Sequence, residues 1–113
     1  MTSATPMPGQ PVRGSTTGKP LMAALDLLGR RWSLRLLWEL RREPIGARAL
    51  RELCDGMSSS VLYQRLGELS DAGLIDKTTD GAYRLTDVGI ALRAALASLD
   101  QWSNDWATTL QHT

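Results

Sequence analysis

The sequence contains no phenylalanine, one cysteine and one histidine among its 113 residues. The single Cys54 cannot form an internal disulfide, which is typical of proteins in a reducing compartment. The single histidine, His112, has no companions at the spacing of metal ligands, so the sequence predicts no metal site. A fold that depends on disulfides or on a bound metal is therefore not expected.

Long hydrophobic runs are also missing. No stretch approaches the roughly eighteen apolar residues that a membrane span requires, and the N-terminus lacks the basic start and apolar core of a secretion signal. The composition, with 42% hydrophobic and 22% charged residues, is that of an ordinary soluble domain. We therefore expect a cytoplasmic protein with no membrane partner.

The sequence contains no motif that is typical of a catalytic site. A chain of this length forms one domain and is short for most catalytic scaffolds. No nucleophile, base and orienting group can be assembled from the sequence, and it has no phosphate-binding loop. We predict that the protein is not an enzyme and that it binds no cofactor.

The charges are nearly balanced in number but unevenly placed. The net charge is +1, yet residues 1–51 carry 9 basic and 3 acidic side chains, whereas residues 52–113 carry 4 basic and 9 acidic ones. So small a net charge does not by itself indicate a nucleic-acid partner. The arginines of the first half can still contact phosphates, provided that the acidic side chains lie on another face.

The chain divides near residue 20. Residues 1–19 are rich in Pro, Gly, Ser and Thr and show no apolar periodicity, which predicts a flexible tail. Residues 20–113 are expected to form one folded domain. Pro20 suits the first turn of a helix that Gly29 ends, and Ser33 is expected to cap a second helix that ends before Pro44. A third helix is expected over residues 47–54.

The region from Ser58 to Leu85 carries the most specific pattern. Ser58 is placed to cap a helix that ends at Gly73. The two residues 55–56 end the helix before it. Residues 74–78 and 82–85 are predicted strands, joined by a two-residue turn at residues 80–81. This order predicts a winged helix-turn-helix, a mainly α fold with a small β-hairpin wing (α+β), and hence binding to double-stranded DNA.

The outward face of the helix that follows Ser58 suits a major groove. The helical period turns hydrogen-bonding side chains outward, and the predicted recognition-helix site comprises Ser58, Ser59, Ser60, Tyr63, Gln64 and Arg65. Glutamine can make two hydrogen bonds to adenine, hydroxyls can reach bases or phosphates, and the flanking arginine can clamp a phosphate. The alternative is a helix face that is merely solvated.

Three further basic residues are candidate phosphate contacts. Arg48 lies on the expected third helix, and Lys77 and Arg84 lie on either side of the hairpin. Acidic residues close to the hairpin leave a second interpretation open, in which Lys77 and Arg84 are ordinary surface charges.

A last helix is expected over about residues 86–111, with Thr86 as its cap. Its apolar residues recur at intervals of three and four: Val88, Leu92, Leu96, Leu99, Trp102, Trp106 and Leu110. This stripe is longer than a small core can cover. We therefore expect its outer portion to contact a second subunit.

The four tryptophans and the cysteine each allow two interpretations. Trp32, Trp38, Trp102 and Trp106 can line a cavity for a small planar effector, although packing anchors between subunits are the favoured interpretation. Cys54 is favoured as a small buried filler over a redox switch, because it lies on the apolar side of its helix.

Three blocks of the sequence resemble the HxlR family of bacterial winged helix-turn-helix regulators. They are ALDLLGRRWSLRLLWEL at residues 24–40, GMSSSVLYQRLGELSDAGLI at residues 56–75 and YRLTDVG at residues 83–89. The resemblance implies a homodimer that binds an inverted-repeat operator and most often represses. It also implies an interface formed largely by the first and last helices, with Leu21, Leu25, Leu96, Leu99, Trp102 and Trp106.

Three features depart from the family pattern. Lys19 stands where members that sense oxidants have a cysteine, which excludes thiol sensing through that position. The hairpin is shorter than the usual loop, which argues against deep contact with a minor groove, and Ala47 replaces a bulky aromatic. The near-neutral charge also keeps an alternative function open, namely a winged-helix module that binds a protein and not DNA.

Overall fold

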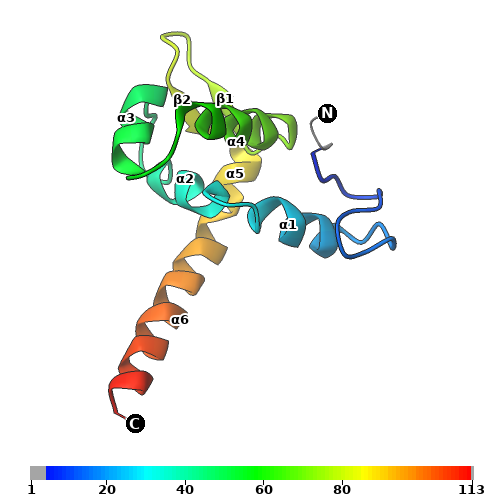
Figure 1. Cartoon of the computed structure of the whole chain (residues 1–113), viewed down its shortest axis with the longest axis vertical. Helices are drawn as coiled ribbons and strands as arrows, with labels where there is room; N and C mark the ends of the chain where they lie inside the picture. Colours follow the sequence, from blue (N-terminus) through cyan, green and yellow to red (C-terminus); the bar gives the residue numbers. More distant parts are fainter. Residues whose placement is uncertain (1–4, 113) are drawn as a thin grey trace.

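The structure is a computed structural model that describes residues 5–112 of the chain (Figure 1). Its elements, in order, are α1 (Pro20–Leu28), α2 (Ser33–Glu39), α3 (Ala47–Leu53), α4 (Ser59–Asp71), β1 (Ile75–Lys77), β2 (Tyr83–Leu85), α5 (Asp87–Ala91) and α6 (Arg93–Gln111). This order confirms the predicted mainly α fold with a two-stranded wing. In the described part of the chain, no helix is both long enough and apolar enough to cross a membrane.

The core is built mainly from leucine. Leu36 and Leu37 of α2, Leu50 of α3 and Leu69 of α4 have no exposed surface. The hairpin adds three buried side chains to the same cluster, and α6 adds one: Ile75, Tyr83, Leu85 and Leu96. Because burying a leucine stabilises a fold by about 1.5–3 kcal/mol, this cluster can hold the helices together without phenylalanine.

The ends of α4 are defined by two local motifs. The hydroxyl of Ser58 accepts a hydrogen bond from the amide of Val61 at 3.2 Å, which confirms the predicted cap. At the other end Gly73 takes a left-handed conformation with φ of 80°. The amide of Leu74 then donates to the carbonyl of Leu69 at 3.0 Å, which closes a Schellman motif and turns the chain into β1.

The turn of the wing differs from the prediction. The Thr78 amide donates to the Ala82 carbonyl at 2.8 Å, so three residues, and not two, connect the arms of the hairpin. Gly81, with φ of 88°, donates to the Thr78 carbonyl at 3.0 Å. A three-residue connection that ends in a left-handed glycine is a common alternative to the two-residue turn. The extended link before α3 pairs with the hairpin, because Ile45 and Tyr83 exchange two backbone hydrogen bonds of 2.9 Å.

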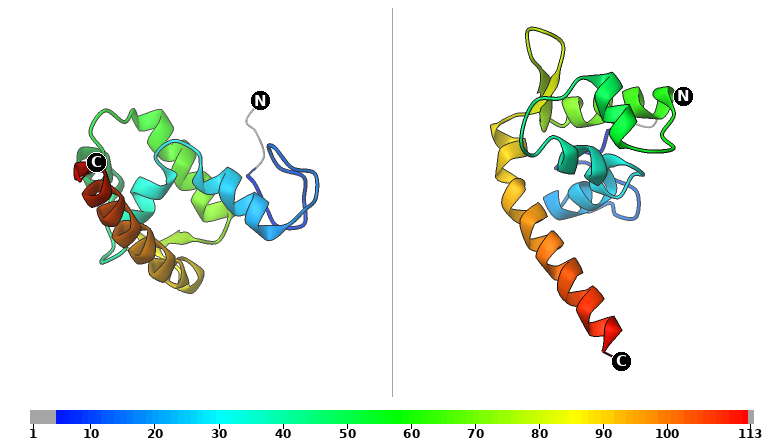
Figure 2. Two further views of the ribbon diagram at one scale, coloured as in Figure 1. Left: turned by 90° about the horizontal axis from the view of Figure 1, so that it is seen from below. Right: turned by 90° about the vertical axis from the view of Figure 1, so that its left-hand side faces the viewer.

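The single last helix that the sequence predicts is divided at Leu92 into α5 and α6. The amide of Leu92 donates to the carbonyl of Gly89 at 3.1 Å, three residues back, which tightens the turn. Thr86 caps α5, as predicted, by accepting from the amide of Gly89 at 3.2 Å. A side chain on Gly89 would meet the Leu74 carbonyl oxygen at 2.1 Å, so glycine allows α5 to lie against the start of the hairpin. The longer α6 then projects away from the other helices (Figures 1 and 2).

The start of α2 also differs from the prediction. Its capping position is Trp32, which has a left-handed φ of 77°, and Ser33 is already the first helical residue. The Ser33 hydroxyl is buried and has no hydrogen-bond partner among the described residues. Ser33 is therefore not the cap, because the chain enters the helix one residue earlier than the sequence pattern indicates.

The N-terminal segment forms a loop beside α1. The amide of Gly9 donates to the carbonyl of Gly18 at 2.8 Å, Pro6 is buried, and the Thr5 hydroxyl donates to Asp71 at the end of α4. The backbone amide of Arg13 donates to the carboxylate of Asp26. Mobility over residues 1–19 stays a prediction, and its first four residues lie outside the described part.

Candidate nucleic-acid interface

The helix pair α3 and α4 forms the candidate interface. The connecting turn spans five residues and contains Gly56, whose φ is 86°. The Arg51 guanidinium donates to the Met57 carbonyl at 3.2 Å, which holds the turn against α3. A hollow of about 700 Å³ opens between the two helices, with Arg48, Ser58, Ser59 and Tyr63 on its rim.

The side chains of α4 divide between core and surface as the helical period predicts. Leu62, Leu66 and Leu69 are buried, and the predicted base-reading residues are exposed: Ser59, Ser60, Tyr63 and Gln64. Neither Tyr63 nor Gln64 makes a side-chain hydrogen bond within residues 5–112. Tyr63 and Gln64 therefore present a hydroxyl and an amide group that the fold itself does not use.

Arg65 does not join this face. Its Nε donates to the carbonyl of Arg31 at 2.7 Å, and its Nη1 donates to the carboxylate of Glu68 at 3.1 Å. The side chain is only 16% exposed. Since both contacts are to groups of the chain itself, Arg65 supports the orientation of α4, and we leave it out of the proposed DNA-contacting set.

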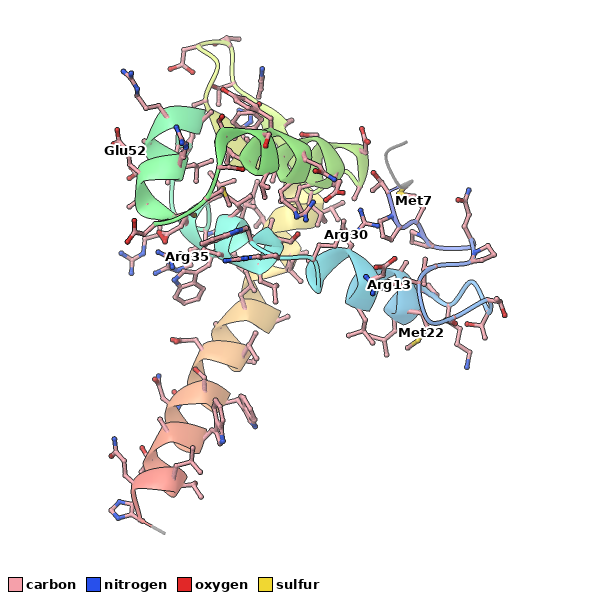
Figure 3. All side chains as sticks on the ribbon, in the orientation of Figure 1. Met7, Arg13, Met22, Arg30, Arg35 and Glu52 are labelled. Carbon is pink, nitrogen blue, oxygen red and sulfur yellow. The ribbon has the colours of Figure 1, made fainter. Side chains whose placement is uncertain are left out.

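Glu68 is the centre of an ion-pair network that the sequence reasoning missed. Its carboxylate is 8% exposed and accepts from Arg65 and from the guanidinium of Arg30. Arg30 also lies 3.9 Å from Asp26 of α1, and Figure 3 shows it at the junction of α1 and α4. The network thus joins α1 to α4. The sequence contains one indication of this network. Arg65 and Glu68 are three residues apart, and side chains at that spacing meet on a helix surface.

The remaining predicted phosphate contacts differ in their surroundings. Arg48 is exposed and has no ion-pair partner within residues 5–112. Arg84 forms an exposed ion pair with Asp76, with 2.9 Å between Nε and the carboxylate. The Lys77 ammonium lies over the ring of Tyr83, 5.4 Å from its centre. Arg48 is therefore the predicted contact most available to a phosphate.

The tip of the wing is acidic. The hydroxyl of Thr78 donates to the carboxylate of Asp80, and this hydrogen bond lowers the pKa of Asp80 below its ordinary value. Asp80 is thus ionised at neutral pH and repels a phosphate backbone. Together with the pairing of Arg84, this favours only a peripheral role for the wing at DNA.

The four tryptophans do not form one cavity. Trp32 and Trp38 pack against the core, and the guanidinium of Arg41 lies 3.6 Å from the centre of the Trp38 ring. Trp102 and Trp106 are exposed on α6, where their rings stack with 5.5 Å between centres. Within the single chain the two pairs thus lie in different surroundings, and a cavity that all four line at the dimer interface stays a prediction.

Most residues of the predicted dimer interface are exposed in the single chain. Leu21 and Leu25 of α1 and Leu99, Trp102 and Trp106 of α6 leave 47–63% of their surface accessible. Leu96 is different, since it is 6% exposed and belongs to the chain's own core. We therefore leave Leu96 out of the exposed part of the interface.

Cys54 is fully buried in the core cluster. This burial raises the pKa of the Cys54 thiol, which disfavours the reactive thiolate. The structure thus agrees with the favoured interpretation of this residue as a small buried filler.

A helix pair joined by a short glycine turn, followed by a hairpin and backed by a leucine core, defines a winged helix-turn-helix protein. The chain belongs to the HxlR-like helix-turn-helix family, whose model matches residues 27–111. An uncharacterized HTH-type transcriptional regulator of Mycobacterium tuberculosis is 33% identical to this chain over 97 residues. The match covers 79% of this chain and 60% of that relative, so the chain spans about three fifths of the curated relatives.

Solved structures share the fold. A protein described as a transcriptional regulator of the MarR family from Enterococcus faecalis superposes with a TM-score of 0.73 at 27% identity, covering 90% of this chain and 98% of that one. Quinone-bound YodB from B. subtilis superposes with a TM-score of 0.70 at 27% identity, and the match covers 75% of this chain and 94% of YodB. A protein from Thermoplasma volcanium, described as a possible HxlR family transcriptional factor, superposes with a TM-score of 0.66 at 26% identity. The match covers 75% of this chain and 82% of that one.

Proposed function

We propose that this protein binds double-stranded DNA sequence-specifically as a homodimer and represses transcription from an inverted-repeat operator. The observation that carries the proposal is the outer face of α4, where exposed hydroxyl and amide groups lie opposite a buried leucine stripe. A recognition helix of this kind enters the major groove and reads base edges. Gln64 is the residue that we assign to adenine, through its amide oxygen and nitrogen.

Phosphate contacts complete the proposed mode of binding. Arg48 lies beside the N-terminus of α4, where unpaired backbone amides and the helix dipole favour an anion. Ser58 and Ser59 add hydroxyl groups at the same end of the helix. These groups set the position of α4 on the duplex, and the base contacts of Tyr63 and Gln64 then select the sequence.

The experiment is an operator selection from random duplexes, followed by affinity measurements on the selected site. We expect Gln64→Ala to weaken operator binding by about 5- to 150-fold, which corresponds to roughly 1–3 kcal/mol for a bidentate base contact. The preference at one base pair should relax in parallel. Gln101→Ala, an exposed change on α6, is the matched control and should leave affinity unchanged. An unaltered affinity of the Gln64 variant would remove the assignment of this face.

A second candidate function follows from the near-neutral net charge. A winged-helix module can bind a protein partner through the same face and not contact DNA. If the selection yields no enriched duplex even at low salt, while one protein repeatedly co-purifies with the chain, this second function replaces the first.

A response to a small planar effector is a finer part of the proposal. Support comes from quinone-bound YodB, which shares this fold at 27% identity. In this chain the ligand would meet the exposed pair Trp102 and Trp106, since Trp32 and Trp38 pack against the core. Tryptophan fluorescence titrated with quinone-like compounds is the test, and a flat response across a broad panel would remove the effector.

A further inference from the structure

A second hollow flanks α4 on the side away from the hollow between α3 and α4. It measures about 580 Å³ and lies between the N-terminal segment, the turn from α1 to α2, and α4. Gln64 and Glu68 line it, whereas Ser59 and Tyr63 line the hollow between α3 and α4. Because a helix turns about 100° per residue, the neighbours Tyr63 and Gln64 point in directions about 100° apart. The two hollows therefore open on the two flanks of the proposed base-reading face.

The second hollow carries more positive than negative groups. Four arginines and two acidic residues line it, namely Arg13, Arg30, Arg31, Arg65, Asp26 and Glu68. Ion pairs join Arg30 and Arg65 to the two carboxylates. Arg13 and Arg31 are exposed and have no ion-pair partner within residues 5–112. Two guanidinium groups at this hollow thus remain available to an anion.

The turn from α1 to α2 holds Arg31 beside α4. The Arg65 guanidinium donates to the carbonyl of Arg31 at 2.7 Å, so the turn is anchored to the residue that follows Gln64. The guanidinium of Arg31 itself lies 5.3 Å from the centre of the Trp32 ring. A guanidinium that stacks on a ring by its face keeps its edge N–H groups for a phosphate.

The N-terminal segment brings Arg13 to the same hollow. The Arg13 amide donates to the carboxylate of Asp26 at 3.3 Å, and Val12 and Ser15 on either side exchange two backbone hydrogen bonds. Figure 3 shows Arg13 beside α1. A basic side chain from outside the helix-turn-helix is therefore held next to α4.

The conformation of Trp32 also points to a function for this turn. Within residues 5–112, Trp32 is the one residue other than glycine with a positive φ, at 77°. A bulky side chain in the left-handed region is strained, and such strain is concentrated at functional sites. Here the strained residue directly follows Arg31 and sets the direction in which the chain leaves it.

We propose that Arg13 and Arg31 bind backbone phosphates of the DNA strand opposite to the strand that Arg48 contacts. This contact rests on the proposed function, in which α4 enters the major groove, and adds the N-terminal segment to the DNA-binding surface. The major groove is about 12 Å wide, so a helix in it has a sugar-phosphate strand on each flank. The hollow near Arg48 faces one strand, and the second hollow faces the other. Contacts on both flanks fix the rotation of α4 about its axis, and hence the base edge that Gln64 meets.

Phosphate-ethylation interference on the selected operator tests the contact directly. With the full wild-type chain, ethylation should interfere with binding at phosphates of both strands in each half-site. Arg31→Ala and Arg13→Ala should each lose interference on one strand, and Arg48→Ala should lose it on the other. Arg93→Ala, which removes an exposed arginine of α6, is the matched control and should keep the complete pattern.

Salt dependence is a second measurement, and a change in stability alone does not move it. Arg31→Ala and Arg13→Ala should each reduce the slope of log affinity against log salt by about 1, with the selected sequence unaltered. Each should weaken binding by about fivefold at about 0.15 M salt. Arg31→Lys keeps the charge and should retain the slope.

The outcomes separate this contact from the proposed function. An operator that Arg31→Ala and Arg13→Ala bind with unchanged slope and unchanged interference would overturn the contact and leave DNA binding through α4 in place. Loss of interference at the same phosphates as in Arg48→Ala would overturn the assignment to opposite strands. A wild-type chain that selects no duplex would overturn the proposed function, and this contact with it.

Discussion

At the scale of single residues, Glu68 explains why the Arg65 side chain does not lie on the outer face of α4. The carboxylate is nearly buried and is paired with Arg30 and Arg65. A buried carboxylate that loses such partners is costly, so the fold directs Arg65 inward. The contact of Arg30 with Asp26 extends this constraint to α1.

Glu68→Gln should therefore destabilise the protein. Glutamine keeps the shape but removes the charge that two arginines face, and we expect a loss of about 2 kcal/mol, less than for a fully buried pair because both arginines are partly exposed. Urea denaturation measures the change. Glu52→Gln on the exposed surface of α3 is the control, and equal stability of the two variants would contradict the assigned role.

Ser33→Ala should not destabilise the protein. The hydroxyl is buried without a partner within the described residues, and removing an unsatisfied polar group is neutral or stabilises by up to about 1 kcal/mol. Thermal and urea unfolding of the variant check this. A loss of more than about 1 kcal/mol would show that the hydroxyl is hydrogen-bonded in solution.

Cys54 should react slowly with thiol reagents. Burial raises the pKa of its thiol, so at pH 8 labelling should require opening of the fold and should accelerate in step with urea unfolding. Because the folded pKa lies above the unfolded value, the thiol's contribution to stability is present at neutral pH and declines above about pH 8.5. Rapid labelling of the native protein at pH 8 would contradict this prediction.

At the scale of elements, α4 is the segment whose limits are set most locally. The Ser58 cap and the Gly73 turn satisfy backbone groups at its two ends, and both are visible in the sequence. The start of this helix is also the site proposed for phosphate contact. The cap that stabilises the first turn of α4 therefore also holds the groups that we propose to contact phosphates.

Ser58→Ala should cost about 1 kcal/mol of stability, since the amide of Val61 loses its acceptor. Operator affinity should fall as well, because the first turn of α4 would fray where it meets the backbone. Circular dichroism melts and binding isotherms measure the two effects. Ser70→Ala, exposed in the last turn of α4, is the control, and a Ser58 variant that behaves like it would refute the cap's contribution.

At the scale of the whole molecule, the chain is more extended than a compact domain. Its radius of gyration is 15.2 Å, against about 13 Å expected for this length. The difference follows from α6, whose outer turns lie away from the core and carry exposed leucine and tryptophan. Such a surface is typical of a subunit whose remaining apolar contacts lie in a partner.

Leu25→Glu should dissociate the dimer without unfolding the chain, because this side chain is 58% exposed on α1. We expect the dimer dissociation constant to rise at least tenfold, on the order of 1.4 kcal/mol or more, and affinity for a two-half-site operator to fall with it. Light scattering across a concentration series measures the shift. Leu53→Glu on α3, also exposed, is the control, and an equal effect there would contradict the assignment of α1 to the interface.

Local features of the fold were predictable from the sequence because each depends on residues near one another in the chain. The Ser58 and Thr86 caps, the left-handed Gly73 and the leucine period of α4 all act over four or five residues. The exposed face with Tyr63 and Gln64 follows from the same period. Its role at DNA stays a prediction.

Several of the remaining features depend on contacts between distant parts of the chain, which no local pattern contains in full. Arg65 turns inward because Arg31 and Glu68 meet it there, and Leu96 is buried because α6 begins beside the core. Ser33 loses its capping position to the left-handed turn at Trp32. Sequence periodicity thus determines which face of a helix is apolar, whereas packing between helices determines whether that face, and each charge beside it, meets the chain itself or remains open to a partner.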